Sequence, residues 1–463
     1  MDAFKSIEKV MTDLKSTPVQ ISLFKDLYSR FISDKNKKTD WSTISTPTEE
    51  AIIDYSSLEE IDYKKSKDLL SKVAMCRLNG GLGTSMGCIG PKSAIEVKDG
   101  KTFLDFIVAQ IQALNEDYQV NVPLILMNSF STDHDTKKII EQYNDNLTIQ
   151  TFQQNEFPRL RRDSLMPLNR EEFGDKVSYP PGHGDFYYSI MQSGILDDLI
   201  EQGIKYIYIA NSDNLGASID LKILNLLESS KAPFLMEVTD KTRADIKGGT
   251  LITTKENSLQ LLEIAQVPED YKEEFKSVKK FKIFNTNNVW IDILELKKKL
   301  LSYSLQLDVI VNKKVVNRHP VIQLETAIGS GINSFEGSLA VKVPRKRFLP
   351  VKKTDDLLLI QSNLFTEEKG LLIKNPDRQF EGLPLIRLGE KFRTVESYQK
   401  RIKEIPNILE LDLLTIVGNV YFGKKVTLQG NVILICDGDE LHISNNSFIE
   451  NQVMTGNIMI GEL

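Results

Sequence analysis

The first fifty residues carry apolar side chains at helical spacing. They recur three and four positions apart in two runs, which are Phe4, Ile7, Val10, Met11 and Leu14 and then Ile21, Phe24, Leu27 and Phe31. This period places apolar side chains on one face of a helix. The polar segment 33–40, SDKNKKTD, follows as a connection. We therefore predict an N-terminal helical extension over residues 1–50 that packs on the rest of the chain. A partner-binding arm is the alternative.

The middle of the chain alternates short apolar runs with helical patterns. Six runs are predicted to be strands: Lys72–Leu78, Val122–Asn128, Leu147–Phe152, Ile204–Asn211, Ala232–Val238 and Lys282–Ile291. Helical patterns occupy Leu104–Asp117 and Asp185–Gln202. Alternation of this kind is typical of a doubly wound α/β domain. Because such folds bind ligands at the carboxyl ends of their strands, the residues that follow each strand are the ones to inspect.

From about Leu409 onward the helical period disappears. Three valines recur every six residues, with glycines at or near the bends between them, and these residues are Val420, Val426 and Val432 with Gly418, Gly423 and Gly430. This spacing predicts two or three coils of a parallel β-helix. A plain antiparallel hairpin is the alternative, and periodicity by itself leaves it open.

Composition and charge narrow the class of protein. The chain has 463 residues, which is long for a single core and predicts two or three domains. Its 41% hydrophobic and 26% charged residues are typical of a globular enzyme rather than of a disordered chain. The net charge of −6 gives no basic footprint for nucleic acid, and the short basic cluster PRKRF at 344–348 is expected to be a solvated loop.

The cysteine pattern and the lengths of the apolar runs bear on the cellular location of the protein. The three cysteines, Cys76, Cys88 and Cys436, match no zinc or redox spacing, so free thiols in a reducing compartment are the simplest explanation. A redox role for Cys76 or Cys88, which flank a glycine-rich loop, stays open. The N-terminus has no apolar signal-peptide core, and no apolar run is long enough to span a bilayer. We expect a cytoplasmic protein without a membrane partner.

The glycine-rich segment 79–93, NGGLGTSMGCIGPKS, follows the first predicted strand. Glycine has no Cβ atom, so such a backbone can take positive φ, approach a ligand closely and direct several N–H groups at an anion, above all phosphate. Lys92 would add a positive charge at the edge of the loop. A Walker loop is excluded because Pro91 stands between Gly90 and Lys92, and a dinucleotide fingerprint is excluded by the spacing of the glycines.

The segment TDHD at Thr132–Asp135 superficially looks like a metal site. It lies at the predicted start of a helix, where aspartates cap N–H groups and favour the helix dipole, so capping is the expected role. The chain has four histidines and no His/Cys cluster, so we expect no zinc site.

The combination LNGGLGTSMG…GPKS resembles the nucleotide-binding loop of sugar-nucleotide pyrophosphorylases. In detail it is similar to the eukaryotic UTP–glucose-1-phosphate uridylyltransferase (UDP-glucose pyrophosphorylase) family, because Ser85 stands where bacterial sugar nucleotidyltransferases usually carry arginine. Further motifs follow in the family's order, namely TFQQNEFPRL, YPPGHGD, YIANSDNLGA, KGGTL, IFNTNNVWI, QLETAIG and RFLPVKKTDDLLL. The resemblance covers the chain from about Lys72 to the C-terminus, and the first fifty residues match weakly.

The resemblance implies a fold and a domain plan. It implies an α/β nucleotidyltransferase domain (GT-A-like, Rossmann-like) with a doubly wound mixed sheet over residues 51–385. This domain would follow the helical extension at 1–50 and precede a left-handed parallel β-helix domain at 386–463. Animal and fungal members of the family assemble into octamers through this last region, whereas other members are monomers. A homo-oligomer through the β-helix therefore stays open.

The reaction implied by the resemblance converts UTP and glucose 1-phosphate into UDP-glucose and pyrophosphate, with Mg²⁺ as the cofactor. An oxygen of the sugar phosphate attacks the α-phosphorus of UTP, and pyrophosphate leaves in line. Because the attacking phosphate is already anionic, positioning and electrostatic stabilisation would carry the catalysis.

The resemblance also implies roles for individual residues. Lys92 and Lys352 are the implied catalytic lysines, and Asp213 is the implied ligand of Mg²⁺ at the end of a strand. UTP binding is implied for Leu78, Asn79, Gly80, Gly81, Gly83, Lys92, Gln154, Gly182 and Lys352. Contacts to the sugar phosphate are implied for Gly80, Gly81, His183, Asn211, Ser212, Asp213, Gly249, Glu263, Asn287, Asn288 and Glu325. Arg159 is interpreted as structural, bonding backbone carbonyls.

Two other functions are kept beside this one. The first is a UDP-sugar or UDP-N-acetylhexosamine pyrophosphorylase of broader specificity, because pocket volume cannot be read from sequence. The second is a catalytically silent nucleotide-sugar-binding protein, against which the joint presence of Lys92, Asp213 and Lys352 argues. Arg77 departs from the lysine expected before the loop, but no role is attached to that position.

Overall fold

The computed structural model describes residues 3–34, 40–143, 147–242, 245, 248–253, 258–380 and 382–455. The chain divides into two compact units. The first unit combines Met1–Gly80, Leu114–Asn211 and Ile219–Phe348, and the second combines Gly81–Ala113, Ser212–Ser218 and Leu349–Leu463. Each unit thus draws on three separate segments of the chain. Among the described residues, no helix is both long enough and apolar enough to cross a membrane.

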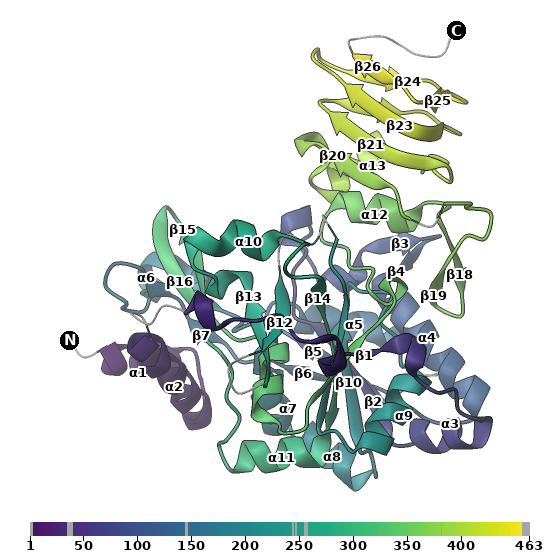
Figure 1. Ribbon diagram of the computed structural model, residues 1–463. Helices are drawn as coiled ribbons and strands as arrows, with labels where there is room; N and C mark the ends of the chain where they lie inside the picture. The colour runs from purple at the N-terminus through teal and green to yellow at the C-terminus, as the bar shows by residue number, and fades with distance from the viewer. Residues whose placement is uncertain are drawn as a thin grey trace. The chain divides into compact units, whose positions relative to one another are not determined.

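An eight-stranded mixed sheet is the centre of the first unit (Figure 1). Its strands, in order across the sheet, are β1 (Ile53–Asp54), β17 (Leu339–Lys342), β11 (Phe234–Asp240), β14 (Ile283–Asp292), β10 (Tyr206–Asn211), β2 (Val73–Asn79), β5 (Leu124–Asn128) and β6 (Ile149–Gln153). β14 runs antiparallel to both of its neighbours, and the other pairs are parallel. All six predicted strands are present, with ends within two residues of those expected. The predicted α/β fold is confirmed.

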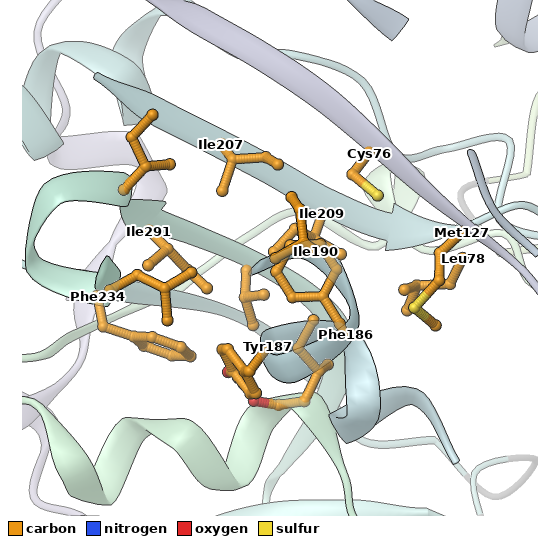
Figure 2. Packing of buried hydrophobic residues seen from close by; sticks show 14 of the residues in the cluster. Cys76, Leu78, Met127, Phe186, Tyr187, Ile190, Ile207, Ile209, Phe234 and Ile291 are labelled. Carbon is orange, nitrogen blue, oxygen red and sulfur yellow. The ribbon is translucent and has the colours of Figure 1, made fainter. Parts of the chain in front are cut away.

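The central strands are buried on both faces of the sheet. Every residue of β2 and of β5 is buried, which is why these strands are mostly apolar rather than alternating, apart from Arg77 and the asparagine that ends each strand. Figure 2 shows side chains of β2, of β10 and of helix α7 (Phe186–Gln192) gathered in one core. Helices α8 (Ile195–Glu201) and α11 (Ile293–Leu301) pack on α7 and contribute to the same core.

The helical pattern predicted over Asp185–Gln202 is confirmed, but the segment forms two helices, α7 and α8, rather than a continuous one. Gly194 lies between them with a φ of +82°, a left-handed conformation that ends a right-handed helix. Both helices bury their apolar residues in the same core, so the apolar period runs on across the break. Periodicity alone therefore could not reveal it.

Shorter elements complete the first unit. Its remaining helices are α1 (Ala3–Asp13), α2 (Pro18–Asp34), α3 (Tyr63–Leu70), α5 (Asp133–Ile140), α6 (Arg170–Phe173), α9 (Leu221–Ser230) and α10 (Lys272–Lys276). Its small sheets are β12 (Gly249–Thr253) with β13 (Leu259–Glu263), then β15 (Ile310–Val316) with β16 (His319–Glu325) and β8 (Leu160–Arg161), and finally β7 (Phe157–Pro158) with β9 (Ser178–Tyr179).

The two predicted N-terminal helices, α1 and α2, are confirmed and pack on the rest of the first unit. Their apolar faces share one buried cluster with residues of β7, β9 and β16, and its members include Phe24, Leu27, Phe31, Phe157, Tyr179 and Leu324. This packing supports the extension rather than the partner-binding arm. The polar connection predicted at 33–40 lies mostly outside the described residues.

The basic cluster at 344–348 is not a simple solvated loop, so that expectation is wrong. The Arg347 side chain is buried, and its Nε and Nη2 atoms donate to the Glu237 carboxylate of β11 at 2.9 and 2.7 Å. Arg347 Nη1 lies 3.3 Å from the Asp220 carboxylate. A buried cation persists only with such partners, and a short basic run in sequence gives no sign of them.

The second unit contains most of the glycine-rich loop, the beginning of a long helix and the C-terminal part of the chain. Its helices are α4 (Phe103–Tyr118), whose last residues from Leu114 belong to the first unit, α12 (Thr354–Gln361) and α13 (Val395–Arg401). Two small antiparallel sheets pair β3 (Glu96–Lys98) with β4 (Lys101–Thr102) and β18 (Phe365–Glu368) with β19 (Leu371–Lys374).

The tail of the second unit is a series of parallel strand pairs. They join β20 (Leu385–Leu388), β21 (Leu411–Val417), β22 (Val420–Phe422), β23 (Thr427–Ile435), β24 (Leu441–Ile443), β25 (Phe448–Glu450) and β26 (Val453–Thr455). The antiparallel hairpin considered for this region is therefore wrong. From β21 onward, pairing joins residues about twenty positions apart, such as Leu414 with Val432 and Val420 with Leu441. All three valines of the six-residue period are buried.

Candidate functional site

Polar side chains stand at the carboxyl ends of three neighbouring strands of the main sheet. β2, β5 and β10 are parallel, and their last residues are Asn79, Asn128 and Asn211. Asn79 pairs with Asn128 in register, and Leu78 pairs with Asn211. The sheet therefore brings the beginning of the glycine loop and the start of the NSD motif to one edge, as the rule for open α/β sheets predicts.

A hydrogen-bonded floor holds the first residues of the glycine loop. Asn79 Nδ2 donates to Asn128 Oδ1 at 2.8 Å and to Thr136 Oγ1 at 2.9 Å. Thr132 Oγ1 donates to the Asn79 carbonyl and Ser129 Oγ to the Gly80 carbonyl, both at 2.9 Å. The backbone that leaves β2 is thus fixed by side chains that follow β5. A loop fixed in advance would lose little conformational entropy when it binds a ligand.

Gly80 lies against Gln154, which follows β6. A Cβ atom at position 80 would lie 1.9 Å from Gln154 Nε2. The backbone N–H of Gln154 donates to the Asn128 carbonyl at 2.8 Å. A larger residue at position 80 would therefore displace the Gln154 amide, and positive φ is not the reason for glycine here. Of the loop's glycines, only Gly87 has a positive φ, at +73°.

Gly182 and His183 form the turn that begins the short helix before α7. Gly182 has a φ of +87°, and a Cβ there would lie 2.8 Å from the Thr326 carbonyl and 3.2 Å from Glu325 Cβ. His183 Nδ1 accepts the backbone N–H of Ile328 at 2.9 Å. Because Nδ1 is an acceptor, the neutral ring carries its proton on Nε2.

Glu325 ends strand β16 beside this turn. Its Oε1 accepts a hydrogen bond from Asn312 Nδ2 at 3.0 Å. Burial raises the pKa of Glu325 above its ordinary value, although the bond from Asn312 and the charge of Lys314 act in the opposite direction. The side chain is a partly buried acceptor, as a contact to a sugar hydroxyl requires.

Gly249 and Glu263 face each other across the β12–β13 pair. A Cβ at position 249 would lie 2.7 Å from Glu263 Oε1, so a larger residue there would displace that carboxylate. Lys247 of the KGGTL motif lies outside the described residues. These two candidates are brought into direct contact.

Asn287 lies in a bulge of β14, between Asn285, which pairs with Val238 of β11, and Asn288, which pairs with Glu237. Asn287 has a φ of +60°, a conformation that asparagine tolerates better than most residues, and its Oδ1 accepts from Asn285 Nδ2 at 2.8 Å. Asn288 is fully buried, and its Nδ2 donates to Glu237 Oε2 at 3.1 Å. The bulge thus separates the two amides: Asn287 is half-buried, whereas Asn288 belongs to the buried cluster of Glu237.

In the second unit the glycine loop closes on itself before Lys92. The backbone N–H of Lys92 donates to the Gly81 carbonyl at 3.1 Å, and Leu82 forms a bridge with Pro91. A Cβ at Gly83 would lie 2.7 Å from Cys88 Cβ, whereas a Cβ at Gly81 meets no atom within 4 Å. All three cysteines of the chain carry free thiols.

The two predicted catalytic lysines of the second unit meet on one carboxylate. Lys92 Nζ lies 2.6 Å from Asp213 Oδ2 and also donates to the Val351 carbonyl, and Lys352 Nζ lies 3.7 Å from the same Asp213 oxygen. Ser212 and Asp213 follow β10 in the chain. Burial acts to raise the pKa of Asp213, but the charges of Lys352 and Lys92 and the bond from Lys92 outweigh it and hold the pKa below its ordinary value.

The Asp213 carboxylate has one oxygen to spare. Its Oδ1 atom is buried and accepts no hydrogen bond, although the side chain is 12% exposed. Among the described residues, no group of three or more His, Cys, Asp or Glu side chains could hold a metal ion. A single carboxylate still fits Mg²⁺, because this ion keeps water molecules and takes phosphate oxygens as further ligands. Asp213 is therefore the residue that could hold the ion.

The aspartates of the TDHD segment do not cap α5, so that expectation is wrong. The N-cap residue is Thr132, and its side chain makes no capping hydrogen bond. Asp133 instead accepts from Asn128 Nδ2 at 3.0 Å and from Gln153 Nε2 at 2.6 Å. Asp133 and Asp135 do lie in the first turn of the helix, where the dipole favours them.

The sequence analysis did not identify Asp356, which binds the backbone that carries Lys352. Asp356 Oδ2 accepts the backbone N–H of Lys352 at 2.7 Å and that of Lys353 at 3.0 Å, at the start of α12. An acidic residue three positions into a helix is a known N-terminal signal, so the sequence TDD could have indicated Asp356.

The interpretation of Arg159 as structural is supported, because its guanidinium donates to the carbonyls of Lys176 and Ser178.

The α/β sheet of the first unit and, in the second unit, a glycine-rich loop with two lysines on one carboxylate are features expected of a nucleotidyltransferase. Comparison with known proteins narrows this class. Residues 21–429 match the family described as UTP–glucose-1-phosphate uridylyltransferase. A protein of that name from Encephalitozoon cuniculi is 48% identical over 461 residues, which cover 98% of this chain and 92% of the relative. The chain belongs to the UTP–glucose-1-phosphate uridylyltransferase family.

Further relatives and solved structures agree with this membership. UTP–glucose-1-phosphate uridylyltransferase 2 of Dictyostelium discoideum is 47% identical, with 96% of this chain and 89% of the relative covered. The structure of UDP-glucose phosphorylase from Trypanosoma brucei has a TM-score of 0.88 at 34% identity and covers 98% of this chain and 99% of its own. A Leishmania major UDP-glucose pyrophosphorylase mutant in complex with UDP-glucose has a TM-score of 0.89 at 32% identity, with the same coverage.

Proposed function

We propose that the protein is a Mg²⁺-dependent uridylyltransferase that converts UTP and glucose 1-phosphate into UDP-glucose and pyrophosphate. The observation that carries the proposal is the cluster of Lys92 and Lys352 on Asp213. Two cations beside one carboxylate with a spare oxygen suit a site that must hold polyphosphate and a divalent ion together. Membership of the family supports the same reaction.

In the proposed reaction, an oxygen of the sugar phosphate attacks the α-phosphorus of UTP. The bond from the α-phosphorus to the oxygen that bridges to the β-phosphorus breaks, and pyrophosphate leaves with that electron pair. No proton needs to move, because the nucleophile and the leaving group are both anions. The protein's task is to bring two anions together and to stabilise the charge that builds up between them.

The two lysines divide this task. Lys92 is held by Asp213 and by the Val351 carbonyl, so its charge stands at a fixed place after the glycine loop. Lys352 has a more exposed side chain and a longer distance to Asp213, so it can turn toward a bound phosphate. When bound at Asp213, Mg²⁺ would neutralise phosphate charge and align the reacting groups. The loop residues Gly81 and Gly83 would provide backbone donors to the phosphates.

Ser212 of the second unit and residues of the first unit supply the remaining contacts in this proposal. Leu78, Asn79, Gly80, Gln154 and Gly182 bind the nucleotide, with the Gln154 amide at the uracil edge. His183 donates a hydrogen bond to the sugar phosphate, without transfer of a proton. Hydroxyl groups of the glucose and ribose are contacted by Asn211, Ser212, Gly249, Glu263, Asn287, Asn288 and Glu325. The contact between Gly182 and Glu325 and that between Gly249 and Glu263 support these groupings.

We further propose the domain plan of a helical extension at 1–50, a catalytic domain at 51–385 and a left-handed parallel β-helix at 386–463. Three sets of parallel pairs support the β-helix, because β21, β22 and the start of β23 each pair with a strand about twenty residues further along. If each of three faces of a coil takes about six residues and begins with a buried valine, one coil has about eighteen residues, close to the observed spacing of the pairs. A homo-oligomer through this region stays a proposal, as does the cytoplasmic location.

The test of the function is pyrophosphate release from UTP with Mg²⁺ and a panel of glucose, galactose and N-acetylglucosamine 1-phosphates. Strong preference for glucose 1-phosphate is the expected result. Even release across the panel would instead establish a broad UDP-sugar pyrophosphorylase. Folded protein that binds UTP without releasing pyrophosphate would leave the silent binding protein as the correct reading.

A further inference from the structure

The amide of Gln20 is the start of a directional chain of hydrogen bonds in the first unit. Thr17 immediately precedes α2, and its backbone N–H donates to Gln20 Oε1 at 2.8 Å, while the Gln20 N–H donates to Thr17 Oγ1 at 3.3 Å. This reciprocal pair is a capping box. It fixes the orientation of the Gln20 amide, because Oε1 must face the backbone donor. The Nε2 group is thereby directed away from the helix start.

Gln20 Nε2 donates to Asn155 Oδ1 at 2.8 Å, across 135 positions of sequence. Asn155 is buried, and its Nδ2 donates to Asp185 Oδ1 at 2.7 Å while its backbone N–H donates to Asp185 Oδ2 at 2.6 Å. A carboxylate can only accept, so the Asn155 amide is also oriented without ambiguity. Ser189 Oγ donates to the second Asp185 oxygen. The chain thus runs in one direction from α2 to the buried Asp185 carboxylate.

The link between Asn155 and Asp185 joins two turns that carry proposed ligand contacts. Asn155 directly follows Gln154, and Asp185 lies two residues after His183. The Asp185 carboxylate therefore ties the turn after β6 to the turn that contains His183. Three neutral donors hold this buried carboxylate, and Gln20 in turn holds Asn155, which supplies two of them.

Apolar packing fixes α2 on the same segment of chain. The rings of Phe24 and Phe157 have centroids 5.0 Å apart, and Phe157 lies two residues after Asn155. Tyr179, in the same buried cluster, bonds through its hydroxyl to the Leu324 carbonyl at 2.7 Å. Because α2 is anchored by this cluster, the Gln20 side chain reaches Asn155 from a rigid element.

We propose that Gln20, acting through Asn155 and Asp185, is a positioning residue for the turn that carries Gln154. The N-terminal helical extension would then be part of the nucleotide subsite's construction rather than a peripheral addition. The inference rests on the proposed function only for the identity of the nucleotide, UTP. Loss of the Gln20 donor leaves Asn155 less restrained, so the Gln154 amide samples more orientations and binds the base less tightly.

The decisive variant is Gln20→Glu. Glutamate keeps the capping box, because its carboxylate accepts the Thr17 N–H, but it has no donor for Asn155 Oδ1 and places an oxygen against it. UTP affinity is measured by isothermal titration calorimetry, and kcat and the KM values of both substrates are measured by pyrophosphate release. We expect the UTP dissociation constant and the UTP KM to rise about three- to tenfold, the loss of one net hydrogen bond. The KM of glucose 1-phosphate should change little, whereas the melting temperature should fall by about 2–4 °C because a buried acceptor loses its donor.

Two further variants separate positioning from folding. Thr17→Ala removes the Oγ1 acceptor of the capping box but keeps the backbone donor to Gln20 Oε1 and the Gln20–Asn155 bond, so UTP affinity should stay within twofold of the wild type. In the Asn155→Ala background, Gln20→Glu should cause no further loss, because the chain is already broken. Unchanged UTP affinity in Gln20→Glu, an equal rise of both KM values, or additive effects of the two substitutions would each overturn the proposal. Wild-type protein that binds UTP but releases no pyrophosphate would refute the proposed reaction alone.

Discussion

A Cβ atom at position 80 would stand 1.9 Å from Nε2 of Gln154, so the glycine of the loop and the amide of the β6 turn occupy adjoining space. This distance is far inside van der Waals contact. The Gln154 backbone is anchored on the Asn128 carbonyl, so the turn cannot simply move away. The Gln154 amide and the glycine loop therefore pack directly against each other.

From this contact we predict that Gly80→Ala weakens UTP binding by about tenfold or more, because the added methyl group displaces the Gln154 amide. Isothermal titration with UTP measures the loss. Gly382→Ala is the matched control, since a Cβ at Gly382 meets no atom within 4 Å and its φ is not positive. If both variants bind UTP as the wild type does, Gln154 does not contribute to the site in the orientation seen.

The lysines on Asp213 lead to a prediction about turnover. Lys92→Ala and Lys352→Ala should each lower kcat by about 10²–10³, the effect of losing one group that stabilises the transition state. Lys353→Ala is the control for Lys352, because it removes the same charge at the next position. Steady-state pyrophosphate release at saturating substrates measures the three variants. Near-normal turnover of Lys352→Ala with slow turnover of Lys353→Ala would transfer the role to Lys353.

Much of the fold could be predicted because burial leaves a direct trace in sequence. β2 and β5 are buried on both faces, and a mostly apolar run is the result. The break at Gly194 was missed because both helices around it serve the same core. Arg347 was misjudged because its partners Glu237 and Asp220 lie more than a hundred positions away in sequence.

The site shows the same division between local and distant signals. The glycine loop and Lys92 are visible because their chemistry is contained in fifteen consecutive residues. The Gln20–Asn155 bond and the bulge that turns Asn288 into the interior depend on tertiary neighbours, which no local pattern encodes. Asp356 is an intermediate case. Its position at the start of α12 follows a local sequence rule, but the hydrogen bond that it accepts from the Lys352 N–H could not be predicted from that rule.

Glu325 connects pH to stability. Its pKa is raised by burial, so the folded protein binds this proton more tightly than the unfolded chain does. Stability therefore falls as the pH rises through the window between the ordinary glutamate value of 4.5 and the raised folded value, and the ionised side chain lowers stability at neutral pH. Glu325→Gln should raise the melting temperature at pH 7 by about 1–2 °C and lose this advantage below the ordinary pKa.

The same substitution should raise the KM of glucose 1-phosphate if Glu325 contacts the sugar as proposed. Thermal melts across the pH range and substrate kinetics at pH 7 measure the two effects. The exposed Glu336 provides the control, since Glu336→Gln should change neither of them. A gain in stability that is equal at all pH values would show that the ionisation of Glu325 is not its cause.

Asp213 gives the prediction for the metal ion. Removal of divalent ions with EDTA should abolish pyrophosphate release, and added Mg²⁺ should restore it. Asp213→Asn keeps the shape of the side chain but removes the charge that holds the ion. The Mg²⁺ concentration for half-maximal activity should therefore rise by at least about tenfold, since even indirect ligand contacts contribute 10- to 100-fold to metal affinity.

Asp356→Asn serves as the comparison, because Asp356 accepts the backbone N–H of Lys352 and is not proposed to bind the ion. It should lower kcat while leaving the Mg²⁺ requirement unchanged. If Asp213→Asn instead reduces kcat at an unchanged Mg²⁺ requirement, Asp213 acts only by holding Lys92 and Lys352, and the ion is bound by the substrate phosphates alone.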